Sequence, residues 1–259
     1  MEYSEIKRTY EALREKASNE LHDDKVKNIL KKGLVCCNND VLFGSRPILL
    51  SGINPSDNQK EPKDFIFKDT AGTFWIKKKN QFGPLVNEMA YMDLFPLRVS
   101  RQDSFEKVLK EENKLRADFL SITQDAIENL QPRLIIHANR ASLYYWGLSK
   151  KAEINPWMGY KFRPLNLNDV KELDFISEER LRRFPFYIIE GDFIDSCKRI
   201  NHDRFSSTSL QGTIFIEYVM EERREELKKL MYNADEWQKI WSWIKANKRR
   251  TKLNDTKLR

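Results

Sequence analysis

The fold of this chain depends on one stretch, Arg46-Pro47-Ile48-Leu49-Leu50-Ser51-Gly52-Ile53-Asn54-Pro55-Ser56. Ile48 to Ile53 form a mainly apolar run of strand length, and Asn54-Pro55 ends it. Such a run, ended by turn residues, is typical of a buried strand in an α/β sheet. Pro55 cannot donate to a neighbouring strand and biases Asn54 away from helix. Ligands of open α/β sheets bind at the carboxyl edge, where Asn54 would lie, although an ordinary Asn-Pro turn has the same spacing.

Later segments predict more strands and the helices between them. Residues 89–95, 134–137 and 186–189 are short apolar runs next to prolines, and each predicts a strand. A long helix is expected from Asp103 or Ser104 to about Leu130, and a short one over Glu178–Arg183. Alternating strands and helices predict an α/β fold with a mostly parallel sheet of about four strands.

Helical additions are expected at both ends of the chain. Residues 3–32 predict a helix that His22-Asp23-Asp24 divides and that covers one face of the sheet. From Ser209 the pattern fits both strand and helix, and the charged continuation favours one long helix. Residues 234–248 predict a final helix with an apolar docking stripe. The mostly polar segment 56–84 is expected to be a long loop.

Composition favours one folded domain with a basic tail. The chain has 259 residues and a net charge of +7, but residues 244–259 alone carry +6, with seven Lys and Arg against one Asp. The remainder is therefore nearly neutral, and the high pI does not indicate a basic DNA-binding face on the core. The predicted division is as follows: a domain over 1–245, with a helical arm (1–33), a core (40–220) and C-terminal helices (221–248), then a tail (249–259).

Cysteine usage and hydropathy predict a cytoplasmic protein with no membrane partner. Cys36, Cys37 and Cys197 show no metal-ligand spacing, and adjacent Cys36 and Cys37 are poorly placed to bridge each other. The charged N-terminus lacks the apolar segment of a signal peptide, and no stretch reaches membrane-spanning length.

The segment Gly52-Ile53-Asn54-Pro55 resembles the first motif of the uracil-DNA glycosylase superfamily, in its mismatch-specific branch. Residues 91–98 and 132–141 follow in the order of the second and third core strands of that family. The resemblance covers about residues 40–220. It implies a three-layer α/β/α sandwich that hydrolyses the N-glycosidic bond of uracil or another deaminated base in single- or double-stranded DNA. It also implies catalysis without a metal or another cofactor. The protein itself is expected to be a monomer.

The resemblance assigns the catalytic roles to two residues. Asn54 would orient the attacking water, and the backbone of Gly52, Ile53, Pro55 and Ser56 would shape the base pocket. The second motif corresponds to Ile200–Ser207, in which His202 would donate to the leaving base and Ser206 would contact the substrate. This segment lacks the proline of the family motif, and an ordinary surface turn at His202 is an equal alternative.

Four further residues are candidates for holding the base. The resemblance implies that Phe74 or Phe82 stacks on it, although packing of these aromatics on the core is the simpler interpretation. Asp93 corresponds to the position that reads the edge of the base, and ionised it can only accept. It could instead cap a turn or pair with an arginine. His137 would face the same edge, or serve as a buried structural histidine.

Other functional classes remain open or find no support. A non-catalytic module that binds nucleic acid, a nucleotide or a protein on the same fold is the main alternative, and a hydrolase of free nucleosides or modified nucleotides is a third. Three cysteines cannot supply a four-cysteine iron–sulfur site, and the three histidines show no zinc spacing. The sequence has no phosphate loop, dinucleotide fingerprint or nucleophile elbow.

Overall fold

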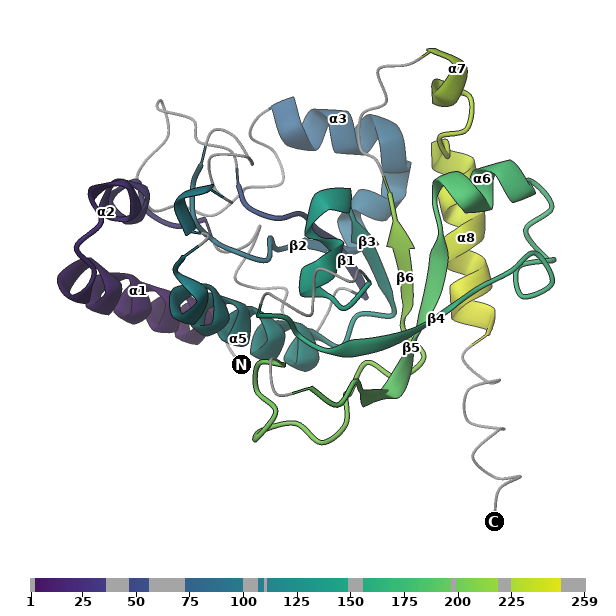
Figure 1. Cartoon of the computed structure of the whole chain (residues 1–259). Helices are drawn as coiled ribbons and strands as arrows, with labels where there is room; N and C mark the ends of the chain where they lie inside the picture. Colours follow the sequence, from purple (N-terminus) through teal and green to yellow (C-terminus); the bar gives the residue numbers. More distant parts are fainter. Residues whose placement is uncertain are drawn as a thin grey trace.

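A central six-stranded sheet organises the chain (Figure 1). The computed structural model describes residues 3–35, 47–55, 73–99, 107–109, 111–148, 156–196, 199–218 and 225–247. The strands follow one another across the sheet in this order: β2 (Met89–Tyr91), β1 (Ile48–Ser51), β3 (Leu134–His137), β6 (Ile214–Glu217), β5 (Phe186–Phe193) and β4 (Tyr160–Pro164). The first four are parallel, and β5 and β4 run antiparallel to their neighbours. The α/β class is therefore confirmed, with six strands where about four were expected.

The segment after Ser209 is the main error of the sequence-based prediction. It forms strand β6 instead of a long helix, and all four residues of β6 are buried between β3 and β5. Helical spacing of apolar residues does not decide the structure here, because pairing on both sides satisfies the backbone of a β-branched segment. Within its described part, the charged continuation forms the short helix α7 (Glu225–Lys228). Residues 219–224 lie outside the described residues.

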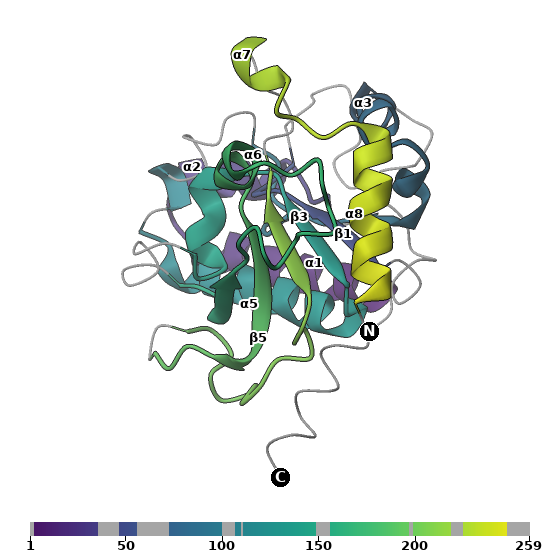
Figure 2. The ribbon, with the colours of Figure 1, turned by 90° about the vertical axis from the view of Figure 1, so that its right-hand side faces the viewer.

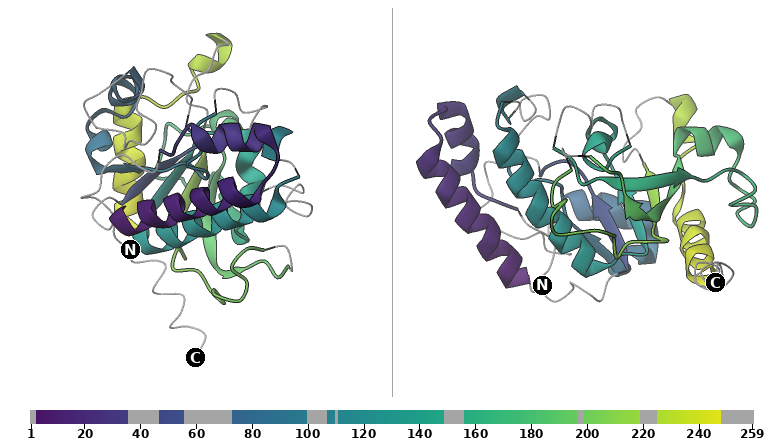
Figure 3. Two further views of the ribbon diagram at one scale, coloured as in Figure 1. Left: turned by 90° about the vertical axis from the view of Figure 1, so that its left-hand side faces the viewer. Right: turned by 60° about the horizontal axis from the view of Figure 1, so that its bottom comes forward.

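The two faces of the sheet bury separate hydrophobic clusters. Side chains of a strand alternate between faces, so Leu49 of β1 joins one cluster while Ile48 and Leu50 join the other. Helix α5 (Asn113–Leu130) covers the first face, and α8 (Ala234–Ala246) covers the second. Figures 2 and 3 show these helices on opposite sides of the strands.

The N-terminal arm packs on a helix and not directly on the sheet. It consists of α1 (Tyr3–Glu20) and α2 (Asp24–Lys31), and the predicted break at residues 22–24 is confirmed. The side chain of Asp23 caps α2 by accepting from the backbone N–H of Lys25 at 2.7 Å. Tyr10 stacks on Phe119 of α5 with ring centroids 5.9 Å apart, so α1 forms an outer layer beyond α5 (Figure 3).

The C-terminal helix confirms its predicted docking stripe. Asn233 and Glu236 form a capping box at the start of α8, and Trp237, Trp241 and Ile244 are buried against the sheet. Within the expected 56–84 loop, residues 73–82 instead form helix α3 (Thr73–Phe82), followed by the 3₁₀ helix η1 (Gly83–Glu88). Residues 56–72 and the expected helix start at 103–104 lie outside the described residues, but one continuous helix to Leu130 is wrong, because residues 111–112 are not helical and α5 begins at Asn113.

Across the described ranges, no helix has the length and apolar character needed to cross a membrane.

Candidate functional site

The site expected from the sequence lies at a topological switch point of the sheet. The chain leaves the carboxyl end of β1 toward β2 on one side, whereas after β3 it continues to β4 on the other side of the sheet. The adjacent ends of β1 and β3 are in register, with Ser51 opposite His137. Open parallel sheets bind ligands in the crevice formed at such a point. Asn54 follows the end of β1 after Gly52 and Ile53, so it lies at the same edge of the sheet as this crevice.

The segment that follows β2 holds the backbone around Asn54 through hydrogen bonds. The N–H groups of Leu94 and Phe95 donate to the carbonyl oxygens of Gly52 and Ile53 at 3.0 and 2.9 Å, which continues the parallel pairing past the end of β1. Val99 N–H donates to the carbonyl oxygen of Pro55 at 3.3 Å. The turn that carries Asn54 is therefore fixed by hydrogen bonds at both ends.

The two polar atoms of the Asn54 carboxamide differ in their hydrogen bonds. Its Nδ2 donates to the carbonyl oxygens of Pro55 at 3.0 Å and Val99 at 3.3 Å, which sets the orientation of the amide. In the described parts of the chain, no group donates to its Oδ1. The side chain is partly exposed. An amide oxygen in this state can accept a hydrogen bond from a water molecule or a ligand, but it cannot act as a strong base.

Asp93 supports the turn from inside the protein. It is 3% exposed, its Oδ2 accepts from the Tyr91 hydroxyl, and its carboxylate accepts from the backbone N–H of Gly52. A Cβ at Gly52 would lie 2.5 Å from Asp93 Oδ1, so this contact requires glycine. With these partners, the carboxylate faces the turn instead of an open pocket. This placement is contrary to the expected role in reading a base edge and matches the turn-capping alternative.

Burial controls the titration of the Asp93–Tyr91 pair. Desolvation raises the pKa of Asp93 to about 7, although the hydrogen bonds from Tyr91 and Gly52 oppose the shift. Desolvation, followed by the nearby Asp93 charge, raises the pKa of Tyr91 well above its ordinary value. Asp93 therefore titrates near neutral pH while it contacts Gly52 in the turn that carries Asn54.

His137 is a buried structural histidine. Its Nδ1 accepts from the indole N–H of Trp146 at 3.3 Å, which leaves Nε2 to donate to Ser142 Oγ at 2.8 Å. Burial lowers the pKa of His137 to about 3, despite a hydrogen bond with the Asn139 backbone that opposes the shift. The ring is fully buried in the cluster that contains Phe215, whereas Tyr91 belongs to the cluster on the other face. His137 and Asp93 thus do not meet in one site.

His202 and Ser206 lie at the opposite edge of the sheet from Asn54. Strand β5 is antiparallel, so the segment that joins its end to the start of β6 lies at the amino edge of the parallel strands (Figure 1). His202 is exposed, with its Nε2 2.9 Å from Asp203 Oδ1, and Ser206 is exposed as well. The expectation that His202 joins Asn54 at one catalytic centre is therefore wrong, and the surface-turn alternative applies.

The aromatic candidates give no open stacking surface among the described side chains. Phe82 is fully buried, with its ring centroid 4.9 Å from that of Trp237 in α8. It is part of the core, and its expected contact with a base is wrong. Phe74 lies in α3, but its side chain and the whole of Ser56 fall outside the described residues.

Comparison with known proteins adds no relative from which roles could be transferred. The sequence matches no protein-family model and no curated protein. Asn54 remains the functional candidate at the carboxyl edge, and Gly52 and Asp93 support the turn that carries it. In the described part of the chain, no three His, Cys, Asp or Glu side chains are grouped to hold a metal ion.

Sequence reasoning missed the partners that determine the chemistry of these residues. Tyr91 precedes Asp93 by two positions, so the alternation of an extended segment could have placed both side chains on one face. Ser142 and Trp146 bind the two ring nitrogens of His137. Their positions depend on how the 3₁₀ helix η2 (Arg140–Tyr145) packs back on β3, for which the sequence has no separate signal.

Proposed function

We propose that this protein is a uracil-DNA glycosylase-like hydrolase that cleaves the N-glycosidic bond of uracil or another deaminated base in DNA. Asn54 would orient the attacking water, and neither a metal nor another cofactor would be needed. The protein would act as a cytoplasmic monomer with DNA as its partner. The finer arrangement that accompanies this proposal is a three-layer α/β/α sandwich, which the two hydrophobic clusters support.

The observation that carries the proposal is the state of the Asn54 side chain. Its amide nitrogen is held by two backbone carbonyl oxygens, so its oxygen points in a set direction without a described donor. A water that donates to this oxygen would be held in place before a base is bound. Positioning of a nucleophile is one of the larger contributions that a site without a strong base can make.

A binding module without catalysis is the second candidate, and a specific observation favours it. A glycosylase benefits from a donor to the departing base, and His202 lies at the other edge of the sheet. The other titratable candidates, Asp93 and His137, are 3% and 0% exposed. Asn54 could then serve as a hydrogen-bonding group for a nucleobase or nucleotide that is bound without being cleaved.

Base release from oligonucleotides distinguishes the two candidates. The substrates would be single- and double-stranded oligonucleotides that contain uracil, hypoxanthine or xanthine, tested with wild type and with Asn54→Ala. The proposal expects release by wild type and at least a hundredfold slower release by the variant, with DNA affinity nearly unchanged. Asn87→Ala, which alters an exposed asparagine of η1, is the matched control and should retain full activity.

The opposite results have clear meanings. Wild type that binds these oligonucleotides without releasing any base would support the binding module. Release that is equally fast in wild type and Asn54→Ala would remove Asn54 from the mechanism. Thermal unfolding of both proteins is needed as a control, because the substitution also removes two hydrogen bonds worth about 1 kcal/mol each.

A further inference from the structure

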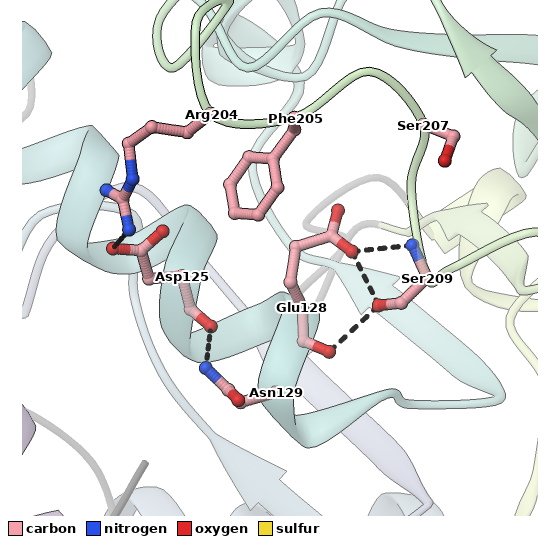
Figure 4. A pocket seen from close by; sticks show the side chains of 7 residues that line it. All are labelled: Asp125, Glu128, Asn129, Arg204, Phe205, Ser207 and Ser209. Atoms are coloured by element: carbon pink, nitrogen blue, oxygen red, sulfur yellow. Dashed lines mark hydrogen bonds and ion pairs between the residues drawn. The ribbon is translucent and has the colours of Figure 1, made fainter.

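A cavity of about 280 Å³ lies between α5 and the segment 199–210 (Figure 4). This segment joins β5 to β6 at the amino edge of the parallel strands, opposite Asn54. Helix α5 contributes Asp125 and Glu128 to its walls, and the loop contributes Arg204, Phe205 and Ser207. Sites for drug-sized molecules begin at roughly 300 Å³, so this cavity suits a small ligand or a single side chain.

Glu128 of α5 holds the segment 199–210 in place through hydrogen bonds. Its Oε1 accepts from the hydroxyls of Thr208 at 2.6 Å and Tyr160 at 2.9 Å, and its Oε2 accepts from the backbone N–H of Ser209 at 2.8 Å and from Ser209 Oγ at 2.5 Å. Both oxygens are thus occupied. Glu128 shapes the cavity and leaves no free acceptor for a ligand.

Two further residues fix the shape of the loop. Ser121 Oγ donates to Asn201 Oδ1 at 2.6 Å, which attaches the loop to α5 one turn before the cavity. Arg199 donates to the carbonyl oxygen of Phe205 at 3.0 Å. The cavity therefore exists without a ligand, which reduces the entropy lost when one binds.

Asp125 has one oxygen that lacks a donor. Its Oδ2 lies 2.8 Å from the guanidinium of Arg204, while its Oδ1 is buried with no hydrogen-bond partner among the described residues. The residue is only 9% exposed, and Figure 4 shows this oxygen directed into the cavity under the Phe205 ring. Burial raises the pKa of Asp125, and Arg204 opposes the shift. A buried acceptor without a donor is destabilising, so a ligand with N–H groups would complete the site.

The charges and the aromatic ring define the ligand further. Two carboxylates face one guanidinium, so the cavity carries a net negative charge and favours a cation. The Phe205 ring also lines the cavity, and the guanidinium of Arg204 already lies over it, 5.6 Å from the ring centroid, so a planar cation beside Asp125 suits this surface. A metal ion fits poorly, because Glu128 is fully engaged and Asp125 Oδ1 is one oxygen where hard cations need six or more ligands.

We propose that this cavity binds a guanidinium group, which donates to Asp125 Oδ1 beside the Arg204 guanidinium. A guanidinium is planar, permanently charged and able to donate several hydrogen bonds in fixed directions. Two sources share this chemistry, a free arginine-like small molecule and an arginine side chain of a polypeptide. The proposal is independent of catalysis at Asn54.

Titration calorimetry on the full chain tests the proposal with three probes. The probes are free arginine, Nα-acetyl-argininamide, in which both ends are capped as in a polypeptide, and Nα-acetyl-lysinamide. Saturable binding of at least one arginine probe is expected, with the lysine probe at least about tenfold weaker. Tighter binding of the capped arginine would identify a polypeptide side chain, and tighter binding of free arginine would identify a small molecule.

Three variants link the binding to the cavity. Asp125→Asn should weaken it about ten- to a hundredfold, because the charge-assisted bond is lost. Asp118→Asn makes the same change on the same helix at a partly exposed position outside the cavity, where the carboxylate pairs with Lys114, and it should bind as wild type does. Ser207→Trp would fill the cavity from an exposed position and should abolish binding even if Asp125→Asn folds poorly. The proposal is overturned if wild type shows no saturable binding, if lysine binds as well as arginine, or if Ser207→Trp binds like wild type.

Discussion

The buried carboxyl of Asp93 makes a quantitative prediction about stability and pH. The pKa of this group is about 7 in the folded protein, against an ordinary value of 3.8. The folded state therefore holds the proton more tightly than the unfolded state does. The stabilisation from this group is fully present below pH 3.8 and is lost as the pH rises through 7.

The size of the effect follows from the difference between the two values. Each pKa unit corresponds to about 1.4 kcal/mol, so the shift of roughly three units corresponds to about 4 kcal/mol. Asp93→Asn removes the titration and preserves the shape. Its amide oxygen can accept from Gly52 N–H, and its NH2 can donate to the Tyr91 hydroxyl. The variant should thus gain up to about 4 kcal/mol relative to wild type between pH 4 and pH 7.

Urea unfolding of both proteins at one-unit steps from pH 4 to pH 8 measures this difference directly. Contributions from other groups cancel when the two curves are subtracted. That includes the contribution of His137, whose lowered pKa makes the fold less stable as the pH falls from 6.5 toward 3. Asp118→Asn controls for the loss of one carboxylate at a partly exposed position. Parallel curves for wild type and Asp93→Asn would refute the argument that burial at Asp93 dominates its titration.

Two other substitutions test contacts on which the two sites depend. Gly52→Ala should lower the free energy of unfolding by about 1–3 kcal/mol and disturb the Asn54 turn, because the added Cβ would lie 2.5 Å from Asp93 Oδ1. An unchanged midpoint in urea would show that Asp93 moves aside freely. Glu128→Gln should destabilise the protein by about 2–4 kcal/mol and speed amide exchange in residues 199–210, because an NH2 group would face hydroxyl or N–H donors. Exchange rates equal to those of wild type would show that the loop is held by other contacts.

Local signals predicted much of the secondary structure. The bounds of β3 (Leu134–His137) and α6 (Glu178–Arg183) agree with the expected ones, and the break before α2 lies at the predicted capping residue. Each of these features depends on residues within a few positions: an apolar run beside a proline, an N-cap serine, or a capping aspartate. Such signals survive in the fold because tertiary contacts reinforce them.

The sequence by itself determined that an apolar strand delivers Asn54 at a sheet edge, since the run from Ile48 and the following Pro55 specify it locally. Only the tertiary structure decided that residues 214–217 form a strand, because pairing with β3 and β5 overrides helical spacing. Because β5 is antiparallel to β6, His202 lies at the opposite edge of the sheet from Asn54. Asp93 and His137 are buried, so they support the fold and do not contact a ligand. Strand direction and burial arise from contacts between distant segments, and no local pattern of residues encodes them.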